Sequence, residues 1–188
     1  MACLGRLRKC IRKSATPTEL IVVNNGDRDE KECKEYADIY IKNDINSLGK
    51  ARNKGFDASI GEYVCFVDND VYADFPFVDR CIELLEKYPD KKLIATPVYT
   101  SCHMFGKYIK GDLDGHMLNT RSGSNCLFMK RESFLDIGRF QELEKGGYFN
   151  GRDGVEFCDR QLNKGYLMIL TRIGLVRDLG LFRYPYRK

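Results

Sequence analysis

The sequence predicts an α/β fold, with one domain in which a mostly parallel central sheet is flanked by helices. Short runs of apolar, often β-branched residues alternate along the chain with segments whose apolar residues recur at helical spacing. This alternation is typical of strand–helix–strand units, whose strands run parallel. The length of 188 residues suits one domain with a hydrophobic core and is short for two.

Each expected element is bounded by residues that end strands or helices. The expected strands are residues 19–23, 38–41, 63–67, 93–98, 125–129 and 166–171, and the expected helices are residues 4–11, 31–36, 49–59, 77–88, 131–137 and 155–164. Pro17 and Pro89 follow two of the helices, and Gly138 and Gly165 stop two others. Residues 101–122 show no firm period and are expected to form a long, partly mobile segment of the kind that often binds ligands.

The composition is that of an ordinary globular protein. Hydrophobic residues make up 43% and charged residues 31% of the chain, and no run of about 18 apolar residues predicts a transmembrane helix. The net charge is +4, with basic clusters at residues 6–13 and 183–188. These clusters would be solvated, or would touch anionic lipid or a phosphorylated ligand. No nucleic-acid-binding motif accompanies them, so we expect no nucleic-acid partner, while peripheral membrane contact stays open.

The cysteines and the N-terminal residues indicate a reducing compartment. None of the eight cysteines forms a Cys-x-x-Cys pair, which argues against a zinc site, and several stand inside apolar runs, where cysteine behaves as a small hydrophobic residue. The first residues soon turn basic and lack the apolar core of a signal peptide. We therefore expect an intracellular, cytoplasmic protein, with or without attachment at a membrane surface.

Two carboxylates follow the strand expected at residues 63–67. Asp68 and Asp70 lie one residue apart at the carboxyl end of this strand, where ligands bind in α/β sheets. Two neighbouring aspartates repel each other unless a cation lies between them, and hard oxygen ligands suit Mg²⁺ or Mn²⁺. Such an ion would hold a diphosphate. A plain turn is an equal alternative, because Asp and Asn side chains bond their own backbone.

Polar residues at two other positions could contact a nucleotide. Asn24 and Asn25 close the strand at residues 19–23; a plain turn is favoured for Asn25, while for Asn24 a turn and a contact to a base or ribose are equal. Helix 49–59, which Asn46 or Ser47 would cap, has Arg52 near its first turn. A basic residue at the positive end of a helix is unfavourable unless an anion lies in front of it, which favours phosphate binding.

A linked series of motifs runs over most of the chain. It comprises residues 48–55 (Leu-Gly-Lys-Ala-Arg-Asn-Lys-Gly), Ala58, residues 61–63 (Gly-Glu-Tyr), the Asp-x-Asp motif at residues 68–70, residues 123–128 with Arg131 and Gly138, residues 153–160 and residues 165–166. In order and spacing, this series resembles the core of the family 2 glycosyltransferases. The resemblance implies a Rossmann-like fold of the GT-A type, a nucleotide-diphosphate sugar as donor, and transfer that usually inverts the anomeric carbon.

The resemblance also implies roles for residues in donor binding. Asp68, Asn69 and Asp70 would bind the donor diphosphate and the metal, with Asp70 the more direct metal ligand. Asn24, beside Asn25, stands where the family usually has an aspartate that meets the nucleobase; an amide can still pair with a pyrimidine edge. Arg52 would lie near the base or the diphosphate.

Further roles concern the acceptor and the chemistry. Gly123 and Asn125 would line the acceptor side. Asp153 is the first candidate for the base that takes the proton of the acceptor hydroxyl, with a helix N-cap as its alternative role, and Glu156 is the second candidate. Asp178 would be a third metal ligand, although an exposed loop carboxylate is the favoured interpretation. His103 and His116 are interpreted as surface or structural residues.

Two departures from the family pattern stand out. The family's first strand, with a Pro-x-Tyr-Asn-like signature, precedes the first helix, whereas this chain starts inside that helix. Either the given sequence omits that strand or the sheet is built without it, and in the second case we expect an altered nucleoside pocket. The family's Glu-Asp pair before the late helix is here Asp153 followed by Gly154, with Glu156 close behind.

The sequence as a whole predicts a metal-dependent glycosyltransferase. It would move a sugar from a nucleotide-diphosphate sugar, such as UDP-glucose, to a hydroxyl group, with a glycan as the expected acceptor. Donor binding is expected in about residues 1–100 and acceptor binding in about residues 101–188, and the chain could be one domain of a longer protein. The alternatives are a phosphatase of the haloacid dehalogenase type, whose apolar strand and Asp-x-Asp-x-Val pattern residues 63–71 match, and an inactive sugar-nucleotide-binding module.

Overall fold

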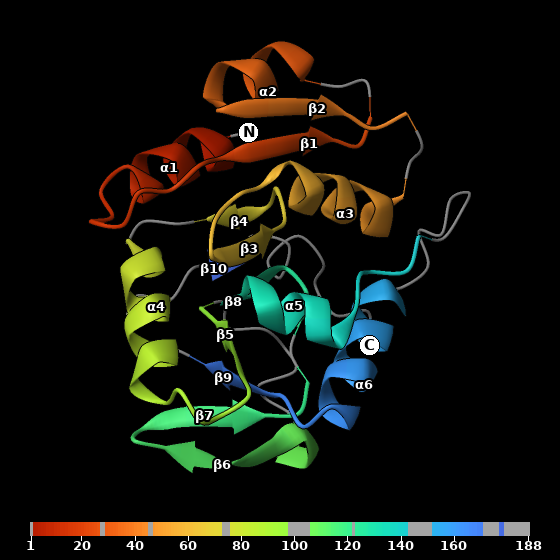
Figure 1. Cartoon of the computed structure of the whole chain (residues 1–188). Helices are drawn as coiled ribbons and strands as arrows, with labels where there is room; N and C mark the ends of the chain where they lie inside the picture. Colours follow the sequence, from red (N-terminus) through yellow and green to blue (C-terminus); the bar gives the residue numbers. More distant parts are fainter. Residues whose placement is uncertain are drawn as a thin grey trace, which may run out of the picture.

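The computed structural model describes residues 2–26, 29–44, 47–72, 76–97, 106–121, 123–142, 152–170 and 177–178. Helices and strands alternate through most of these residues (Figure 1). The helices are α1 (Ala2–Ile11), α2 (Glu30–Tyr36), α3 (Leu48–Ala58), α4 (Phe77–Lys87), α5 (Arg131–Ile137) and α6 (Arg152–Asn163), with a short 3-10 helix at Gly106–Tyr108. The strands are β1 (Ile21–Asn24), β2 (Ile39–Lys42), β3 (Tyr63–Val67), β4 (Val71–Tyr72), β5 (Leu93–Thr96), β6 (Ile109–Leu113), β7 (His116–Asn119), β8 (Cys126–Lys130), β9 (Leu167–Leu170) and β10 (Arg177–Asp178).

The larger sheet confirms the α/β prediction but is mixed. Its six strands lie in the order β3-β8-β5-β9-β7-β6. The pairings make β3, β5, β9 and β6 run in one direction and β8 and β7 in the other, so that β5 and β9 are the parallel neighbours. The expectation of parallel neighbours fails at β7, which a two-residue turn joins to β6, and at β8, which runs antiparallel to both of its neighbours, β3 and β5.

A hairpin occupies half of the segment that was expected to be irregular. Strands β6 and β7 pair antiparallel, with Leu113 opposite His116. The two residues between them, Asp114 and Gly115, have φ angles of 51° and 83°. Positive φ at both turn positions is the signature of the tight hairpin turn that Asp-Gly sequences favour. The Asp-Gly pair was therefore the sequence signal for this hairpin; residues 101–105 lie outside the described part.

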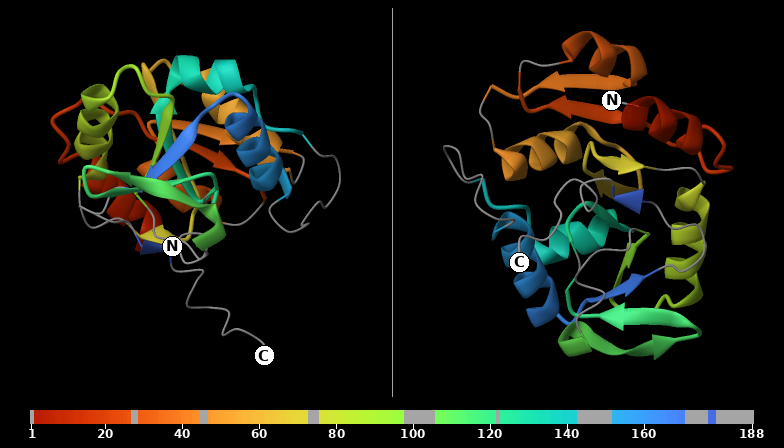
Figure 2. Two further views of the ribbon diagram at one scale, coloured as in Figure 1. Left: turned by 90° about the horizontal axis from the view of Figure 1, so that it is seen from below. Right: turned by 180° about the vertical axis from the view of Figure 1, so that it is seen from behind.

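Strands β1 and β2 form a separate parallel sheet at one end of the molecule (Figures 1 and 2). Within the described residues no strand joins β1 to β3, the outer strand of the large sheet. All four residues of β1 are half-exposed, although its sequence is Ile-Val-Val-Asn. One side of β1 therefore has no strand partner among the described residues.

The two faces of the large sheet carry separate hydrophobic clusters. Successive residues of a strand point to opposite faces, and β8 follows this rule: Cys126 and Phe128 belong to one cluster, Leu127 and Met129 to the other. Helices α1 and α4 cover the first face, and α5 and α6 cover the second together with Phe56 of α3. The result is three layers, with the sheet between helices.

The cluster under α5 is built from aromatic rings. Phe134 of α5 is fully buried, and its ring centroid lies 4.6 Å from that of Phe56 and 4.9 Å from that of Phe66. Burying each such side chain contributes about 1.5–3 kcal/mol, so this contact fixes α5 and α3 against β3.

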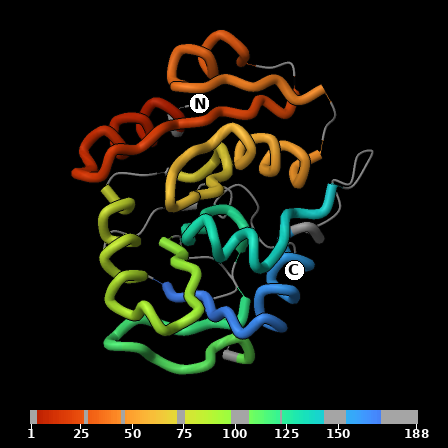
Figure 3. The backbone as a smooth tube through the Cα atoms, in the orientation of Figure 1, coloured from red at the N-terminus to blue at the C-terminus, as the bar shows by residue number. Residues whose placement is uncertain are grey.

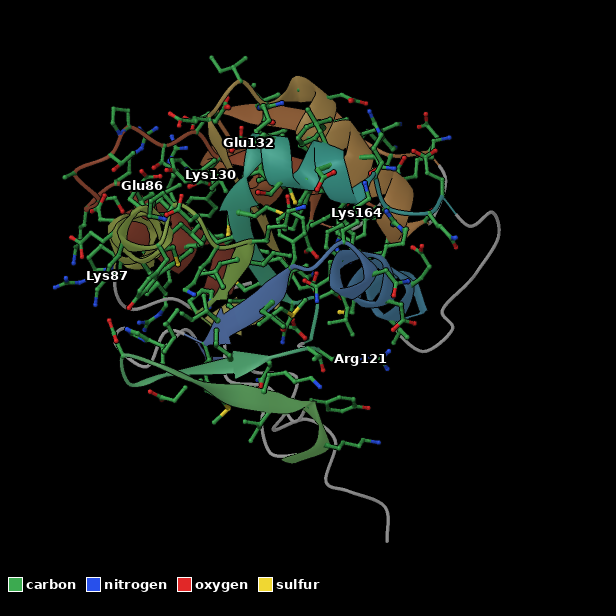
Figure 4. All side chains as sticks on the ribbon, turned by 60° about the horizontal axis from the view of Figure 1, so that its bottom comes forward. Glu86, Lys87, Arg121, Lys130, Glu132 and Lys164 are labelled. Atoms are coloured by element: carbon green, nitrogen blue, oxygen red, sulfur yellow. The ribbon has the colours of Figure 1, made fainter. Side chains whose placement is uncertain are left out.

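An ion pair joins the last residue of β8 to α4: Lys130 lies 3.0 Å from Glu86 (Figure 4). In the described part of the chain, no helix has the length and apolar character that membrane crossing requires.

Candidate functional site

The Asp-x-Asp motif forms a turn at the end of β3. The Val71 N–H donates to the Asp68 carbonyl oxygen (3.2 Å), and the Asp68 N–H donates to the carbonyl oxygen of Asn125 (2.9 Å). Asn69 is exposed, whereas Asp70 is half-buried. The turn that was one interpretation of this motif is therefore present. It satisfies backbone groups and does not use the Asp68 carboxylate, so it is compatible with ligand binding.

Asp68 accepts a hydrogen bond from Arg52 of α3. Arg52 Nη2 lies 2.9 Å from Asp68 Oδ1 and 3.0 Å from the carbonyl oxygen of Ser124. The Arg52 side chain is 6% exposed and that of Asp68 is 30% exposed. The anion in front of this basic residue is thus a carboxylate of the protein itself, which explains why arginine is tolerated in the first half of α3. Ser47, rather than Asn46, caps the helix by accepting from the Lys50 N–H (3.3 Å).

The segment after α5 lies across α3. Asn53 Nδ2 donates to the Phe140 carbonyl oxygen (2.9 Å), and the Phe140 N–H donates to Asn53 Oδ1 (3.1 Å). A Cβ atom on Gly49 would lie 2.0 Å from the carbonyl oxygen of Gln141, so glycine is required there. Figure 3 shows the backbone of residues 138–142 running from α5 toward the start of α3.

The two asparagines at the end of β1 differ in their surroundings. Asn25 Oδ1 accepts from Asn43 Nδ2 (2.7 Å) and from the Ser47 N–H (3.3 Å), so Asn25 ties the end of β1 to the start of α3. This agrees with a structural role for Asn25. Asn24 is half-exposed, and its Nδ2 lies 3.5 Å from the hydroxyl oxygen of Tyr40.

The loop that precedes β8 contacts the start of α6. Gly123, Ser124 and Asn125 are all half-buried. A Cβ on Gly154 would lie 2.6 Å from Ser124 Oγ, so only glycine permits this approach of helix and loop. Asp153, the first base candidate, lies in the first turn of α6 beside Gly154, and its side chain is outside the described part.

Glu156, the second base candidate, faces α5. Its carboxylate accepts from both Nε and Nη2 of Arg160, the latter at 2.8 Å. Arg160 also donates to the carbonyl oxygens of Ile137 and Gly138 (2.8 and 2.9 Å) at the end of α5. These contacts satisfy backbone acceptors that the helix leaves free. The structure therefore places Glu156 in a network that joins α5 and α6.

Asp178 belongs to β10, which pairs antiparallel with β4. In this pairing Asp178 is opposite Val71, the residue after Asp70. The backbone thus brings the third proposed metal ligand beside the Asp-x-Asp turn, while its side chain lies outside the described part. His116 is half-exposed in β7, and His103 is not among the described residues.

The donor set near the turn suits a metal that also binds a phosphate. Among the residues whose side chains the structure describes, no group of three or more His, Cys, Asp and Glu could hold a metal ion. Asp68 and Asp70 supply hard carboxylate oxygens, and Arg52 occupies Oδ1 of Asp68. Mg²⁺ is commonly held by one or two carboxylates together with substrate phosphates and water. The residues therefore fit an ion that a diphosphate helps to hold.

Sequence reasoning missed several residues of this region. Ser124, Phe140 and Gly154 contact or support Arg52 and the loop before β8, but each acts through a partner far away in the chain. The one local signal was Gly154 itself, a glycine directly before the expected helix, which can indicate a close approach of another segment. Nothing in the sequence near Ser124 or Phe140 indicates their partners.

Comparison with known proteins gives three kinds of match. The family model described as glycosyl transferase family 2 matches residues 3–135. Glycosyltransferase GlyA of Streptococcus pneumoniae serotype 4 is 33% identical over an alignment of 93 residues, and the match covers 44% of this chain and 13% of GlyA. The crystal structure of S. aureus TarS superposes with a TM-score of 0.66 at 15% identity, over 93% of this chain and 34% of TarS.

Two structures with bound ligands have the same fold. S. aureus TarS 1-349 in complex with UDP-GlcNAc has a TM-score of 0.64 at 16% identity and covers 94% of this chain and 54% of that one. GalNAc-T7 with UDP, GalNAc and Mn²⁺ has a TM-score of 0.61 at 12% identity, over 89% of this chain and 38% of that one. The chain spans well under two thirds of each of these proteins. At these identities the structures establish the fold alone, which is GT-A.

Proposed function

The chain belongs to glycosyl transferase family 2, and from this membership we propose that it transfers a sugar from a nucleotide-diphosphate sugar to an acceptor hydroxyl group with the help of a divalent metal. The observation that supports this most is the edge of the sheet at the end of β3. There the Asp-x-Asp turn, the loop before β8 and, through Ser124, the start of α6 are held together. This arrangement supports a site in which Asp68 and Asp70 meet the donor and Asp153, in the first turn of α6, takes the acceptor proton.

The proposed donor is a UDP-sugar. TarS binds UDP-GlcNAc and GalNAc-T7 binds UDP, and both share the fold of this chain. Asn24, at the carboxyl end of β1, would pair with the pyrimidine edge, with Asn25 holding the loop around it. Asn69 and the two aspartates would meet the diphosphate. UDP-glucose, UDP-GlcNAc and UDP-GalNAc are the sugars to compare.

The proposed metal is Mn²⁺ or Mg²⁺. Asp70 would hold it directly, Asp68 would contribute the oxygen that Arg52 does not use, and Asp178 would be a further ligand from β10. When bound, such an ion neutralises charge that develops on the departing diphosphate. The proposal is supported by the hard oxygen donors and by Mn²⁺ in the GalNAc-T7 structure.

The proposed chemistry is a single displacement. The acceptor oxygen forms a bond to the anomeric carbon while the bond from that carbon to the diphosphate oxygen breaks. The acceptor proton passes to the Asp153 carboxylate, and the nucleoside diphosphate leaves. Attack on the face opposite the leaving group inverts the anomeric carbon. Gly123 and Asn125, in the loop against α6, would orient the acceptor, for which a glycan is proposed.

The halves of the chain have separate proposed tasks. We propose that residues 1–188 form one glycosyltransferase domain, in which about residues 1–100 bind the donor and about residues 101–188 bind the acceptor. Nucleic acid is not a proposed partner, and contact with a membrane surface would come from the basic residues near the ends. A protein with further domains would fit the small shares of the relatives that this chain spans.

A phosphatase is the less favoured alternative. A haloacid dehalogenase enzyme needs the first aspartate of its motif as a free nucleophile, whereas Asp68 is bonded to Arg52. An inactive binding module would keep nucleotide affinity without turnover. Hydrolysis of the donor in the absence of an acceptor separates this module from a transferase.

The test is a calorimetric titration with UDP, the UDP-sugars, and the GDP and dTDP equivalents, each with and without Mn²⁺. Wild type and Asp70→Ala are compared. We expect metal-dependent binding of one nucleotide by wild type and its loss in the variant. A folded wild-type chain that binds no nucleotide would contradict the proposed function, and release of phosphate from phosphomonoesters would favour the phosphatase.

A further inference from the structure

Arg52 connects parts of the chain that are far apart in sequence. Its Nη2 atom donates to Asp68 Oδ1 (2.9 Å) and to the carbonyl oxygen of Ser124 (3.0 Å), with Ser124 Oγ at 3.4 Å. Asp68 ends β3, and Ser124 stands in the loop before β8. The Arg52 side chain is almost fully buried. A buried guanidinium needs its partners, because an unpaired charge in this position would be costly.

An aromatic ring supports the other side of the Arg52 guanidinium. The Arg52 Cζ atom lies 5.0 Å from the ring centroid of Phe140. That ring stacks on Phe157 of α6, with centroids 4.6 Å apart. The Phe140 backbone is itself fixed by Asn53, one residue after Arg52. The guanidinium is therefore held from both sides, and a planar group stacked on a ring has little freedom to move.

The contact to Ser124 extends to α6. Gly154 lies so close to Ser124 that a Cβ at this position would be 2.6 Å from Oγ. Any shift of Ser124 therefore moves against the first turn of α6, which contains Asp153. Arg52 Nη2 therefore contacts both the Asp68 carboxylate and the residue that packs against the first turn of α6.

We propose that Arg52 is a positioning residue that sets the distance between the donor carboxylates and the first turn of α6, rather than a residue that contacts the donor. This inference rests on the proposed function, since it assigns Asp68 to the donor and Asp153 to the acceptor proton. Arg52 would raise the rate of transfer by alignment. Misalignment by about 1 Å can lower a rate by about 100-fold.

The main variant is Arg52→Lys, which keeps the charge and loses the planar fork. Arg139→Lys is the matched control, because Arg139 is likewise an arginine that donates to a carboxylate, that of Asp57 in α3 (2.7 Å from each Nη atom), but on the exposed surface. Circular dichroism checks that each variant folds. Phe140→Leu is a second variant, which leaves Arg52 in place and removes the ring beneath it.

The first readout separates donor binding from transfer. For Arg52→Lys we expect kcat for transfer to fall by about 10- to 100-fold, while UDP affinity in the presence of Mn²⁺ changes by less than about threefold. Phe140→Leu should lower kcat by less than Arg52→Lys does, again with little change in UDP affinity. Arg139→Lys should change neither kcat nor UDP affinity. A loss of UDP affinity as large as the loss of kcat would overturn the proposal, because Arg52 would then contact the donor.

The second readout does not depend on the proposed function. Hydrogen–deuterium exchange of the ligand-free proteins should be faster in residues 123–130 and 154–160 of Arg52→Lys than in wild type, and unchanged in Arg139→Lys. Unchanged exchange in these residues would overturn the positioning role even if the enzyme is active. If wild type binds no nucleotide but the exchange result holds, the proposed function fails and the role of Arg52 in holding the two elements stands.

Discussion

The side-chain amide of Asn53 forms two hydrogen bonds with the backbone of Phe140, in the way that a neighbouring strand would. The side-chain amide of Asn53 donates to the Phe140 carbonyl oxygen and accepts from the Phe140 N–H, at 2.9 and 3.1 Å. Asn53 is 2% exposed and also donates to Glu142 Oε1 (2.8 Å). One side chain in α3 therefore satisfies the backbone of a segment that belongs to no helix or strand.

The first prediction concerns this amide. Asn53→Ala should lower the free energy of unfolding by about 2–4 kcal/mol, because it leaves the buried N–H and C=O of Phe140 without their partners. Urea unfolding measures the change. Lys54→Ala on the same helix is the control and should stay within about 0.5 kcal/mol of wild type. Equal effects of the two substitutions would mean that the Asn53 bonds are replaced by water.

The second prediction concerns two glycines of α3. Gly49→Ala should destabilise the protein by about 1–3 kcal/mol, despite the higher helix propensity of alanine, because the new Cβ meets the Gln141 carbonyl oxygen at 2.0 Å. Gly55→Ala is the control, since its Cβ would meet a flexible methyl group of Val23 at 3.3 Å. Thermal unfolding should show Gly55→Ala near or above wild type, and the opposite order would contradict the close approach at Gly49.

The third prediction concerns the order of metal and nucleotide binding. Because Mg²⁺ and Mn²⁺ sites of this kind commonly combine one or two carboxylates with substrate phosphates, Mn²⁺ should bind weakly alone and tightly once UDP supplies phosphate oxygens. Electron paramagnetic resonance of Mn²⁺ measures free and bound ion. Asp70→Asn should abolish the effect of UDP. Tight binding of Mn²⁺ without nucleotide would instead show that the proposed protein ligands, Asp68, Asp70 and Asp178, hold the ion without the diphosphate.

The fourth prediction separates the two base candidates. Asp153→Asn should lower kcat for transfer by about 100-fold or more, with UDP binding retained, because the acceptor proton loses its base. Glu156→Gln should mainly reduce stability, since Glu156 orients the Arg160 side chain that caps α5. Steady-state kinetics and thermal unfolding of both variants test this. A large kcat loss confined to Glu156→Gln would reverse the assignment.

The fifth prediction concerns acid unfolding. Burial raises the pKa of Asp38. The hydrogen bond from the Leu20 N–H (2.8 Å) and the guanidinium groups of Arg8 and Arg12 lower this pKa by more than burial raises it, so the pKa lies below its usual value. A carboxylate with a lowered pKa in the folded state adds stability above its unfolded pKa of about 3.9 and loses it as the pH falls.

The melting temperature of wild type should therefore fall between about pH 5 and pH 3 more steeply than that of Asp38→Asn. Asp90→Asn, at an exposed position after α4, serves as the control and should keep the wild-type slope. Parallel curves for wild type and Asp38→Asn would show that other carboxylates govern acid unfolding.

The sequence predicted those elements whose signals are local. Strand β3 has the predicted bounds because Tyr63 to Val67 form an apolar run that ends in Asp and Asn, and α5 has them because Gly138, with φ of 99°, stops it. Alternation of such runs was sufficient for the fold class. The hairpin β6–β7 was missed, although the Asp114-Gly115 pair is a sequence signal for its turn.

Contacts between distant residues were beyond local signals. The basic residue in α3 led to a prediction of phosphate binding, which stays a prediction; the anion that the structure places beside it is Asp68, which lies on another element. Likewise, the need for glycine at position 154 is explained only by the close approach of Ser124, which is distant in sequence. Side-chain partners depend on how the layers pack, and helix dipole or turn chemistry does not encode that packing.

One side of β1 has no strand partner within the described ranges, and this has a consequence for handling the protein. Strand β6, the outermost strand at the opposite end, carries Lys110 and Asp112, and such charges discourage pairing with another molecule. Strand β1 offers Ile21, Val22 and Val23 without a charge, and no described strand pairs with its second side. Concentrated solutions should therefore tend toward edge-to-edge aggregation through β1, and a lysine placed there would act as a gatekeeper.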